Sequence, residues 1–337
     1  MRNNLLCCDW GTSSFRLRLV NQDNLQIVGE VFGPEGIATT FNAWAAANQT
    51  SPVPRKQYFQ QQLRQQIMAL AQQLGISLDT VPIVLSGMAS SSLGLEELPY
   101  AELPFAVDGS QAGVHYFGSQ PDFPHDLMLI SGLRTQQDVM RGEETQLVGL
   151  IELMETASIS EEAIFIFPGT HSKHIIVRQQ QVVDFQTYMT GEVFNLMADG
   201  SILKDSIESP VTKEISESEL NGFRQGVQES GKAGILHGLF TVRTNQLFQN
   251  LNKKQNYFYL SGLLIGTELR SLQQKDTPQI ILSSGSNLYE FYKLAVEELG
   301  LTEHTITIPP DLIDRAAIAG QVTIFQNQLL HDIKTTE

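Results

Sequence analysis

The amino-acid sequence predicts an α/β protein built from two domains, and three observations support this. Apolar runs of strand length alternate with longer segments of helical periodicity along most of the chain. The order strand, Gly-Thr turn, strand, third strand occurs twice, near residues 5–32 and near residues 164–188. The chain has 337 residues, and about 150 residues is typical of one domain. We therefore expect one domain over residues 1–155 and a second over residues 156–337.

The first half of the chain begins with strands and continues with alternating helices and strands. Its clearest helix follows Pro54, repeats apolar residues at helical spacing, and ends before Gly75. Each of the two later strands is followed by a Ser-Gly pair. The elements expected in this half are strands at 5–8, 15–20, 25–32, 82–85 and 127–130, and helices at 55–74 and 139–154.

The second half repeats the opening strand pattern and then becomes mostly helical. Residues 200–220 are polar and acidic, so we expect loops and a helix start there. The elements expected in this half are strands at 164–167, 174–178, 182–188 and 280–282, and helices at 223–250, 257–273, 287–299 and 312–330.

Composition and charge exclude several classes of protein. Hydrophobic residues make up 42% of the chain and charged residues 18%, which is typical of a folded protein with a core. Lys and Arg number 22 against 37 Asp and Glu, so the net charge of −15 argues against binding to nucleic acid. No apolar stretch approaches the roughly 18 residues of a membrane span, and the N-terminus lacks the pattern of a signal peptide. We expect a cytoplasmic protein.

The two cysteines, Cys7 and Cys8, are adjacent. Neighbouring residues do not form an ordinary disulfide, and two thiols alone do not close a zinc site. We expect both to lie in a buried strand as small apolar groups, in a protein of a reducing compartment.

The first candidate site is the turn from Asp9 to Ser14. A tight turn between strands presents backbone N–H groups to a phosphate, with Gly11 permitting close approach and Thr12 and Ser13 adding hydroxyls. Asp9, at the end of the first strand, is a candidate ligand of Mg²⁺. The alternative is an ordinary hairpin in which Asp and Gly only form the turn.

Two further turns of small residues have the same character. Gly169 and Thr170 form a second Gly-Thr hairpin, without an acidic residue at the position matching Asp9. Ser284, Gly285 and Ser286 follow an apolar strand and open a helix, where a planar ligand can lie on the backbone and an anion is favoured. Neither a Walker A loop nor a dinucleotide fingerprint is present in the sequence.

The segment Arg141–Gln146 carries the candidate general base. A carboxylate near a helix start, such as Glu143, can accept a proton from a substrate hydroxyl, although acidic residues also favour exposed helix N-termini. His171 and His174 are three residues apart in a hairpin, which places them on opposite faces and does not predict a metal site. A Gly-x-Ser-x-Gly elbow is absent from the sequence, so a serine hydrolase has no support.

These motifs, in this order, resemble those of one kinase family. The three turns resemble the phosphate-1, phosphate-2 and adenosine motifs of the superfamily of sugar kinases, actin and heat-shock-chaperone ATPases. More narrowly, the chain resembles the 2-dehydro-3-deoxygalactonokinase family. The most specific matching stretches are Met140-Arg141-Gly142-Glu143-Glu144-Thr145-Gln146 and Pro168-Gly169-Thr170-His171. Others are Cys8–Ser13, Ser86–Ala89, Tyr188–Glu192 and Leu260–Gly266.

The resemblance implies a fold, an activity and a place in metabolism. The implied fold is two RNase H-like (actin-like ATPase) domains around an interdomain cleft. The implied activity is ATP-dependent phosphorylation of 2-dehydro-3-deoxy-D-galactonate at its 6-hydroxyl, in galactonate breakdown ahead of an aldolase. ATP and Mg²⁺ are the implied cofactors. The expected partner is a small sugar acid, not nucleic acid or a membrane, and a homodimer is left open.

The resemblance also implies roles for the motif residues. Asp9 would bind Mg²⁺. The phosphates would be held by Gly11, Thr12 and Ser13 of the first turn and by Gly169 and Thr170 of the second. The adenosine would be held by Ser284, Gly285 and Ser286. Related polyol kinases carry a catalytic Gly-Asp pair where this chain has Gly142-Glu143. The base is therefore expected to be Glu143, with Glu144 or Asp138 as alternatives.

A sugar acid carries a carboxylate, so an arginine is expected near it. The candidates are Arg141, Arg134 and Arg16, and the loop from Met88 to Gly94, including Ser90, is expected to line the sugar pocket. Two other functions remain open at this point: a kinase of another sugar or sugar acid, and a non-catalytic ATP-binding regulator on the same fold. The sequence does not distinguish the galactonate-derived substrate from its gluconate epimer.

Overall fold

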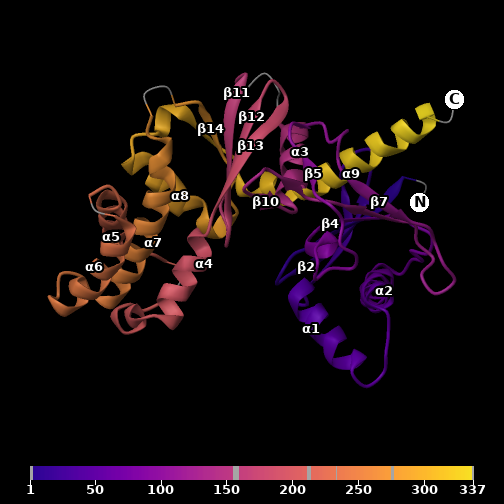
Figure 1. Ribbon diagram of the computed structural model, residues 1–337, viewed down its shortest axis with the longest axis horizontal. Coiled ribbons are helices and arrows are strands. Elements are labelled where there is room, and N and C mark those ends of the chain that lie inside the picture. The colour runs from indigo at the N-terminus through magenta and orange to yellow at the C-terminus, as the bar shows by residue number, and fades with distance from the viewer. Residues whose placement is uncertain (1–2, 155–158, 211–213, 233, 275–276, 336–337) are drawn as a thin grey trace. The chain divides into compact units, whose positions relative to one another are not determined.

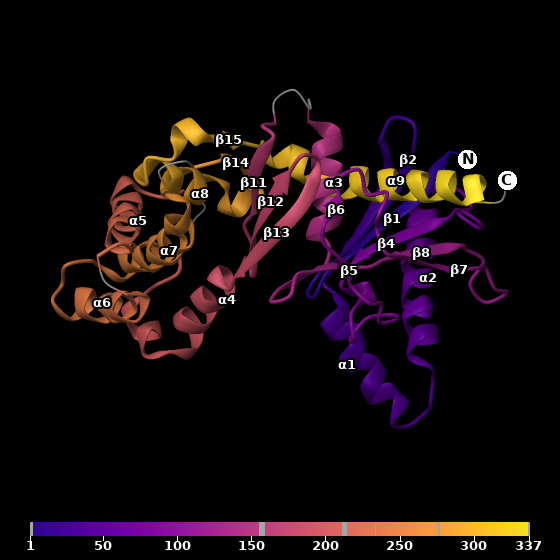
Figure 2. The same ribbon diagram turned by 45° about the horizontal axis from the view of Figure 1, so that its top comes forward.

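The chain folds into two compact units, seen in Figures 1 and 2. The computed structural model describes residues 3–154, 159–210, 214–232, 234–274 and 277–335, with side chains to residue 329. The first unit comprises residues 1–158, 178–184 and 312–337, and the second comprises residues 159–177 and 185–311. None of the helices within the described ranges combines the length and apolar character needed to cross a membrane.

The first unit is built on a mixed sheet with the strand order β3-β2-β1-β4-β8-β7. Strands β1, β2 and β3 pair antiparallel, β4 and β8 continue parallel to β1, and β7 closes the edge antiparallel. The strands are β1 (Asn4–Trp10), β2 (Phe15–Asn21), β3 (Ile27–Gly33), β4 (Ile83–Gly87), β7 (Val114–Phe117) and β8 (Leu127–Ile130). Cys7 and Cys8 are buried in β1, as expected.

Two helices follow the opening strands, α1 (Ile37–Asn48) and α2 (Arg55–Leu74). Helix α2 has the predicted bounds and ends at Gly75, whose φ of +66° is the left-handed conformation common at helix ends. Its apolar residues pack in one core cluster with alternate residues of β1. Helix α1 was not predicted, because its alanine-rich sequence has no strong apolar periodicity.

The segment before α3 (Glu143–Leu153) differs from the sequence expectation of a helix over 139–154. Val139–Met140 is strand β10, which joins β9 (Leu133–Arg134) and β5 (Ala101–Glu102) in a small three-stranded sheet. Gly142 then has a φ of +104°, a conformation that no helical residue adopts. The helix therefore begins at Glu143.

The C-terminal helix α9 (Pro310–Thr335) corrects the expected domain division. Residues 312–337 group with the first unit, not with the second. The reason is close packing: a Cβ at Gly320 would lie 1.8 Å from Thr145 O, and one at Gly149 would lie 1.8 Å from Ala316 O. Gln321 also donates hydrogen bonds of 2.8 Å to Cys8 O and Ser86 Oγ. The expected boundary at 155/156 lies outside the described residues.

The second unit repeats the strand order of the first. Its sheet runs β15-β14-β11-β12-β13-β6, so β13-β12-β11-β14-β15 matches β3-β2-β1-β4-β8. Strands β14 and β15 pair parallel to β11 and β14, respectively. The strands of this sheet are β6 (Phe105–Ala106), β11 (Glu162–Phe167), β12 (Ser172–Arg178), β13 (Gln181–Tyr188), β14 (Gln279–Leu282) and β15 (Thr305–Thr307). By the division given above, β6 and the first residues of β13 are grouped with the first unit. The repeated order confirms the α/β fold class with two RNase H-like units.

The helices of the second unit pack mainly against α7, and Figure 2 shows α5, α6 and α7 together. The helix expected over 223–250 is two helices, because Gly234 precedes the second one in an extended conformation. The helix expected from residue 257 begins earlier, at a capping box formed by Asn252 and Gln255. The helices are α4 (Thr190–Asn195), α5 (Glu217–Glu229), α6 (Ile235–Leu247), α7 (Lys253–Leu269) and α8 (Ser286–Glu298).

Candidate active site

Asp9 lies at the carboxyl end of β1, directly opposite Arg16 on β2. Arg16 Nη1 lies 3.5 Å from Asp9 Oδ2, and the Asp9 side chain is 18% exposed. Burial raises the pKa of Asp9, and the Arg16 and Arg18 charges partly oppose this. Gly87, on the neighbouring strand, has a φ of +81°, and a Cβ there would lie 3.1 Å from Asp9 Oδ1. The absence of a side chain at Gly87 keeps space beside this carboxylate.

The turn after Asp9 is held in place by the start of α1. The Ile37 and Ala38 N–H groups donate to Gly11 O at 2.9 Å and to Thr12 O at 3.1 Å. The Gly11 N–H donates to Ser14 O at 2.9 Å and is therefore used inside the turn. Thr12 and Ser13 are exposed, so they carry the available polar groups of this turn.

Sequence reasoning missed the support of this turn by Gly36. A Cβ at Gly36 would lie 2.4 Å from Thr12 O, so only glycine lets α1 begin this close to the turn. The preceding Pro34-Glu35 pair, followed by Gly36, is a turn signal that marks the start of α1.

The start of α3 brings two adjacent carboxylates to the same edge of the first unit. A Cβ at Gly142 would lie 3.3 Å from Gly87 Cα, so Gly142 packs against the glycine that borders Asp9. Glu144 is 2% exposed and accepts hydrogen bonds from Gly142 N at 2.7 Å and 3.0 Å and from Thr145 Oγ1 at 3.0 Å. Burial, and then the charge of Glu143, raises the pKa of Glu144 to about 7. Glu143, the first residue of the helix, is partly exposed.

The third candidate base lies in a turn. The Asp138 carboxylate accepts a hydrogen bond from the Val139 N–H at 2.7 Å, and the Asp138 N–H donates to Thr135 Oγ1 at 2.8 Å. These contacts shape the turn between β9 and β10 and give Asp138 a local structural role.

The expected substrate residues differ in their surroundings. Arg141 donates to Ser90 Oγ at 2.8 Å and to Leu98 O at 2.9 Å, and its guanidinium lies 3.9 Å from the centre of the Tyr100 ring. Ser90 is fully buried, so Arg141 and Ser90 together fix the loop that carries the partly exposed Met88. Arg134 is exposed and paired with Glu102.

In the second unit, the turn Gly169-Thr170 is supported by the start of α4. The Glu192 N–H donates to Thr170 O at 3.0 Å, and a Cβ at Gly191 would lie 2.7 Å from Gly169 O. Thr170 is exposed, and a Cβ at Gly169 would meet nothing within 4 Å, so the outer side of this turn is open. His171 is exposed in the turn before β12, and His174 is buried within β12.

The turn after β14 has one unsatisfied buried hydroxyl. Ser283 and Ser284 are buried, whereas Gly285 and Ser286 are exposed at the start of α8. Ser283 Oγ has no hydrogen-bond partner among the described residues, and a Cβ at Gly285 would meet nothing within 4 Å. A strand, an open turn and a helix start with a free hydroxyl can accept a nucleotide.

Comparisons with known proteins agree on one family. A family model described as 2-keto-3-deoxy-galactonokinase matches residues 9–324. The 2-dehydro-3-deoxygalactonokinase of Escherichia coli (strain K12) is 30% identical over 229 residues, covering 66% of this chain and 72% of that protein. A protein of Rhizobium meliloti (strain 1021), assigned as the same kinase, is 29% identical over 307 residues, covering 88% of this chain and 90% of that protein.

A solved structure supports the same relationship. A crystal structure of a Sinorhizobium meliloti protein, assigned as a 2-dehydro-3-deoxygalactonokinase, superposes with a TM-score of 0.75 at 27% identity. The superposition covers 95% of this chain and 97% of that one. The similarity therefore extends over both units.

Proposed function

The chain belongs to the 2-keto-3-deoxy-galactonokinase family, and on that premise we propose that it transfers the γ-phosphoryl group of ATP to the 6-hydroxyl of 2-dehydro-3-deoxy-D-galactonate. The observation that carries the proposal is the family match over residues 9–324, which includes all three phosphate and adenosine turns. The products are ADP and the 6-phosphate of the sugar acid, and the reaction serves galactonate catabolism.

The three turns supply the contacts to ATP. In the first unit, the exposed Thr12 and Ser13 offer hydroxyls and amides to a phosphate, while Gly11 shapes the turn. In the second unit, Gly169 and Thr170 do the same. The Ser284-Gly285-Ser286 turn receives the adenosine, and the open space at Gly285 supports this role. Phosphoryl transfer depends mainly on such positioning and on charge neutralisation.

Asp9 is the proposed ligand of Mg²⁺, and its surroundings fit this ion. Magnesium in phosphoryl-transfer sites is usually held by one or two carboxylates, waters and substrate phosphates. The described residues contain no group of three or more His, Cys, Asp or Glu side chains arranged for a metal. When bound, the ion neutralises charge on the transferring phosphates. Arg16 holds the Asp9 side chain in place.

Glu143 is the proposed general base. Both oxygens of Glu144 already accept hydrogen bonds from the Gly142 N–H, and its side chain is buried. Asp138 shapes a turn. Glu143 is partly exposed at the first position of α3, where its carboxylate can take the proton of the substrate hydroxyl.

Recognition of the sugar acid is assigned to the first unit. Arg16 and Arg134 have exposed guanidinium groups that can pair with the substrate carboxylate. Arg141 and Ser90 act by fixing the loop, and Met88 provides its apolar surface.

Analysis of the product tests the proposal directly. Full-length protein is incubated with Mg-ATP and 2-dehydro-3-deoxy-D-galactonate, and the mixture is followed by ³¹P NMR. We expect a new phosphate monoester on the C6 primary alcohol, formed in equal amount to ADP. Release of inorganic phosphate without an ester, or no turnover with nucleotide binding intact, would contradict it and favour an ATPase or a non-catalytic regulator.

A further inference from the structure

A buried glutamate lies inside the second unit. Glu268 is on α7, in the otherwise uncharged stretch Leu260–Leu269, and is 2% exposed. Burying a carboxylate is costly unless hydrogen bonds compensate it, so a retained buried charge needs an explanation.

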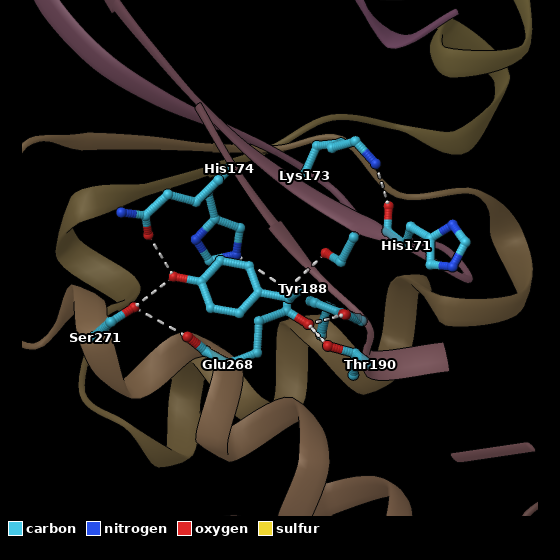
Figure 3. Close-up of polar contacts among 10 residues, drawn as sticks. His171, Lys173, His174, Tyr188, Thr190, Glu268 and Ser271 are labelled. Carbon is cyan, nitrogen blue, oxygen red and sulfur yellow. Dashed lines mark hydrogen bonds and ion pairs between the residues drawn. The ribbon is translucent and has the colours of Figure 1, made fainter. Parts of the chain in front are cut away.

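Four side chains hydrogen-bond to the Glu268 carboxylate, and Figure 3 labels two of them, His174 and Thr190. Ser172 Oγ lies 2.6 Å and His174 Nε2 lies 3.0 Å from Oε1. Thr190 Oγ1 and the Tyr292 hydroxyl contact Oε2, the latter at 2.8 Å. Two carboxylate oxygens offer about four acceptor positions, so these four contacts fill them.

The groups around Glu268 come from the elements that hold the candidate ATP-binding turns. Ser172 starts β12 directly after the Gly169–His171 turn. Thr190 starts α4, whose next residues contact Gly169 O and Thr170 O. Tyr292 lies on α8, the helix that opens at Ser286. The Glu268 carboxylate thus connects β12 and α4, which hold the Gly169-Thr170 turn, with α8, which follows the Ser284-Gly285-Ser286 turn.

We propose that Glu268 is a positioning residue that fixes the Gly169-Thr170 turn relative to α4 and α8, and thereby sets the affinity for ATP. The proposal rests on the assignment of these turns to ATP in the proposed function. Glu268 touches none of the reacting groups, and it acts through Ser172, Thr190 and Tyr292.

The chemistry of the cluster requires an acceptor at this position. Burial, and then the Glu268 charge, raises the pKa of Tyr292 well above its usual value, so its hydroxyl remains a donor. A glutamine at 268 would keep one oxygen acceptor but would turn a neutral NH₂ group toward the contacts of the other oxygen. Those groups would then have to accept instead of donate, and their hydrogen bonds to a charged acceptor would be lost.

The test compares Glu268→Gln with wild type by calorimetric titration of Mg-ATP without any acceptor. We expect the Kd for ATP to rise about tenfold, as expected for losing a hydrogen bond to a charged group. The KM for the sugar acid should change less than about twofold, because its proposed contacts lie in the first unit. An unchanged Kd for ATP in a folded variant would overturn the proposal.

A second pair of variants keeps the proposal testable if Glu268→Gln fails to fold. Thr190→Ser retains the hydroxyl that contacts Glu268 Oε2, whereas Thr190→Val removes it at similar volume. We expect near wild-type ATP affinity for the serine variant and an affinity several-fold weaker for the valine variant. Equal affinities for both would contradict the positioning role.

Asn256 provides a matched structural control on the same helix. Its side chain is fully buried and donates to Ser206 O at 2.9 Å and Val242 O at 2.6 Å, neither of which belongs to the turn supports. Asn256→Ala should lower the melting temperature but leave the Kd for ATP within about twofold. An equal loss of ATP affinity in this variant would reduce the role of Glu268 to general stability. Because binding is measured without acceptor, failure to phosphorylate the sugar acid would contradict the proposed function and leave this test intact.

Discussion

Two adjacent carboxylates at the start of α3 have different environments, and this difference separates their roles. Glu144 is buried and hydrogen-bonded to the Gly142 N–H, whereas Glu143 is partly exposed. Glu143→Gln removes the proposed base and should lower kcat about 10²- to 10⁴-fold, since general base catalysis typically contributes that factor. The Kd for Mg-ATP should remain at the wild-type value.

Steady-state kinetics together with ATP titration checks this prediction. Glu152→Gln is the matched control, because Glu152 is an exposed residue of the same helix. The control should retain wild-type kcat. A Glu143→Gln variant with wild-type kcat would exclude Glu143 as the base and return attention to Glu144 and Asp138.

The pKa of Glu144 makes stability depend on pH. That pKa is raised from 4.5 to about 7 in the folded protein, so between these values the folded state binds more protons than the unfolded state. Glu144 therefore lowers the free energy of unfolding as pH rises between these two values. The total decrease is about 1.4 kcal/mol for each unit of difference between the folded and unfolded pKa. Relative to the non-titrating Glu144→Gln variant, wild type should lose stability from pH 5 to pH 7 and change little above.

Urea unfolding of both proteins at several pH values measures this difference. Glu219→Gln is a useful control, because hydrogen bonds from Ser216 lower the pKa of Glu219. Its stabilising effect is fully present above the unfolded pKa and is lost only at more acidic pH. The difference in stability between wild type and Glu219→Gln should be flat from pH 5 to pH 7. A flat difference between wild type and Glu144→Gln over the same range would contradict the environment assigned to Glu144.

At the residue level, the sequence was most informative where a motif is local. The turns at Asp9–Ser14 and Gly169-Thr170 were predictable, since neighbouring residues form each of them. Glu268 was not, because its partners come from three other elements that only the fold brings together. A lone charge in the apolar stretch Leu260–Leu269 was the available signal.

The packing of α3 on α9 explains why the C-terminal helix groups with the first unit. The backbones touch at Gly149 and Gly320, where an added Cβ would lie 1.8 Å from a carbonyl oxygen. Gly320→Ala should therefore lower the stability of the protein by about 2 kcal/mol or more, because neither backbone can yield cheaply.

The urea midpoint of unfolding is the measurement for this prediction. Gly118→Ala is the control, because a Cβ at Gly118 would meet nothing within 4 Å. The Gly118 variant should unfold at the wild-type midpoint. If Gly320→Ala also unfolded at the wild-type midpoint, the backbone contact between α3 and α9 at Gly320 would be contradicted.

At the level of elements, prediction succeeded where both ends of an element carry signals. Helix α2 was predicted with its observed bounds because Pro54 and Gly75 flank a clear apolar stripe. The start of α3 was placed too early, because apolar Val139 and Met140 extend its pattern although they form a strand. Helix α9 was predicted, but its partners were not, since packing between glycines leaves no apolar pattern.

For the whole molecule, binding of Mg-ATP should appear as increased stability. Ligand at 100 times its Kd stabilises a folded protein by about 2.7 kcal/mol. We expect the melting temperature to rise with Mg-ATP and to rise less when EDTA removes the metal. In Asp9→Asn this dependence on the metal should shrink, because the proposed ligand loses its charge.

Melting curves with ATP, with and without EDTA, check the role of Asp9. Asp23→Asn is the control, because Asp23 is an exposed carboxylate of the first unit. The control should retain the full effect of the metal. If Asp9→Asn also retained it, the metal would be held by other residues.

The repeated Gly-Thr hairpins in the sequence correctly indicated that the two units share a strand order. The family match extends across both units.

The acceptor is the part of the function that local motifs predict least, because residues scattered along the chain recognise it. ADP release with Mg-ATP should be compared for 2-dehydro-3-deoxy-D-galactonate, its gluconate epimer and glycerol. We predict turnover confined to the keto-deoxy sugar acids, with the galactonate-derived acid preferred. Turnover of glycerol without turnover of either acid would contradict the central claim.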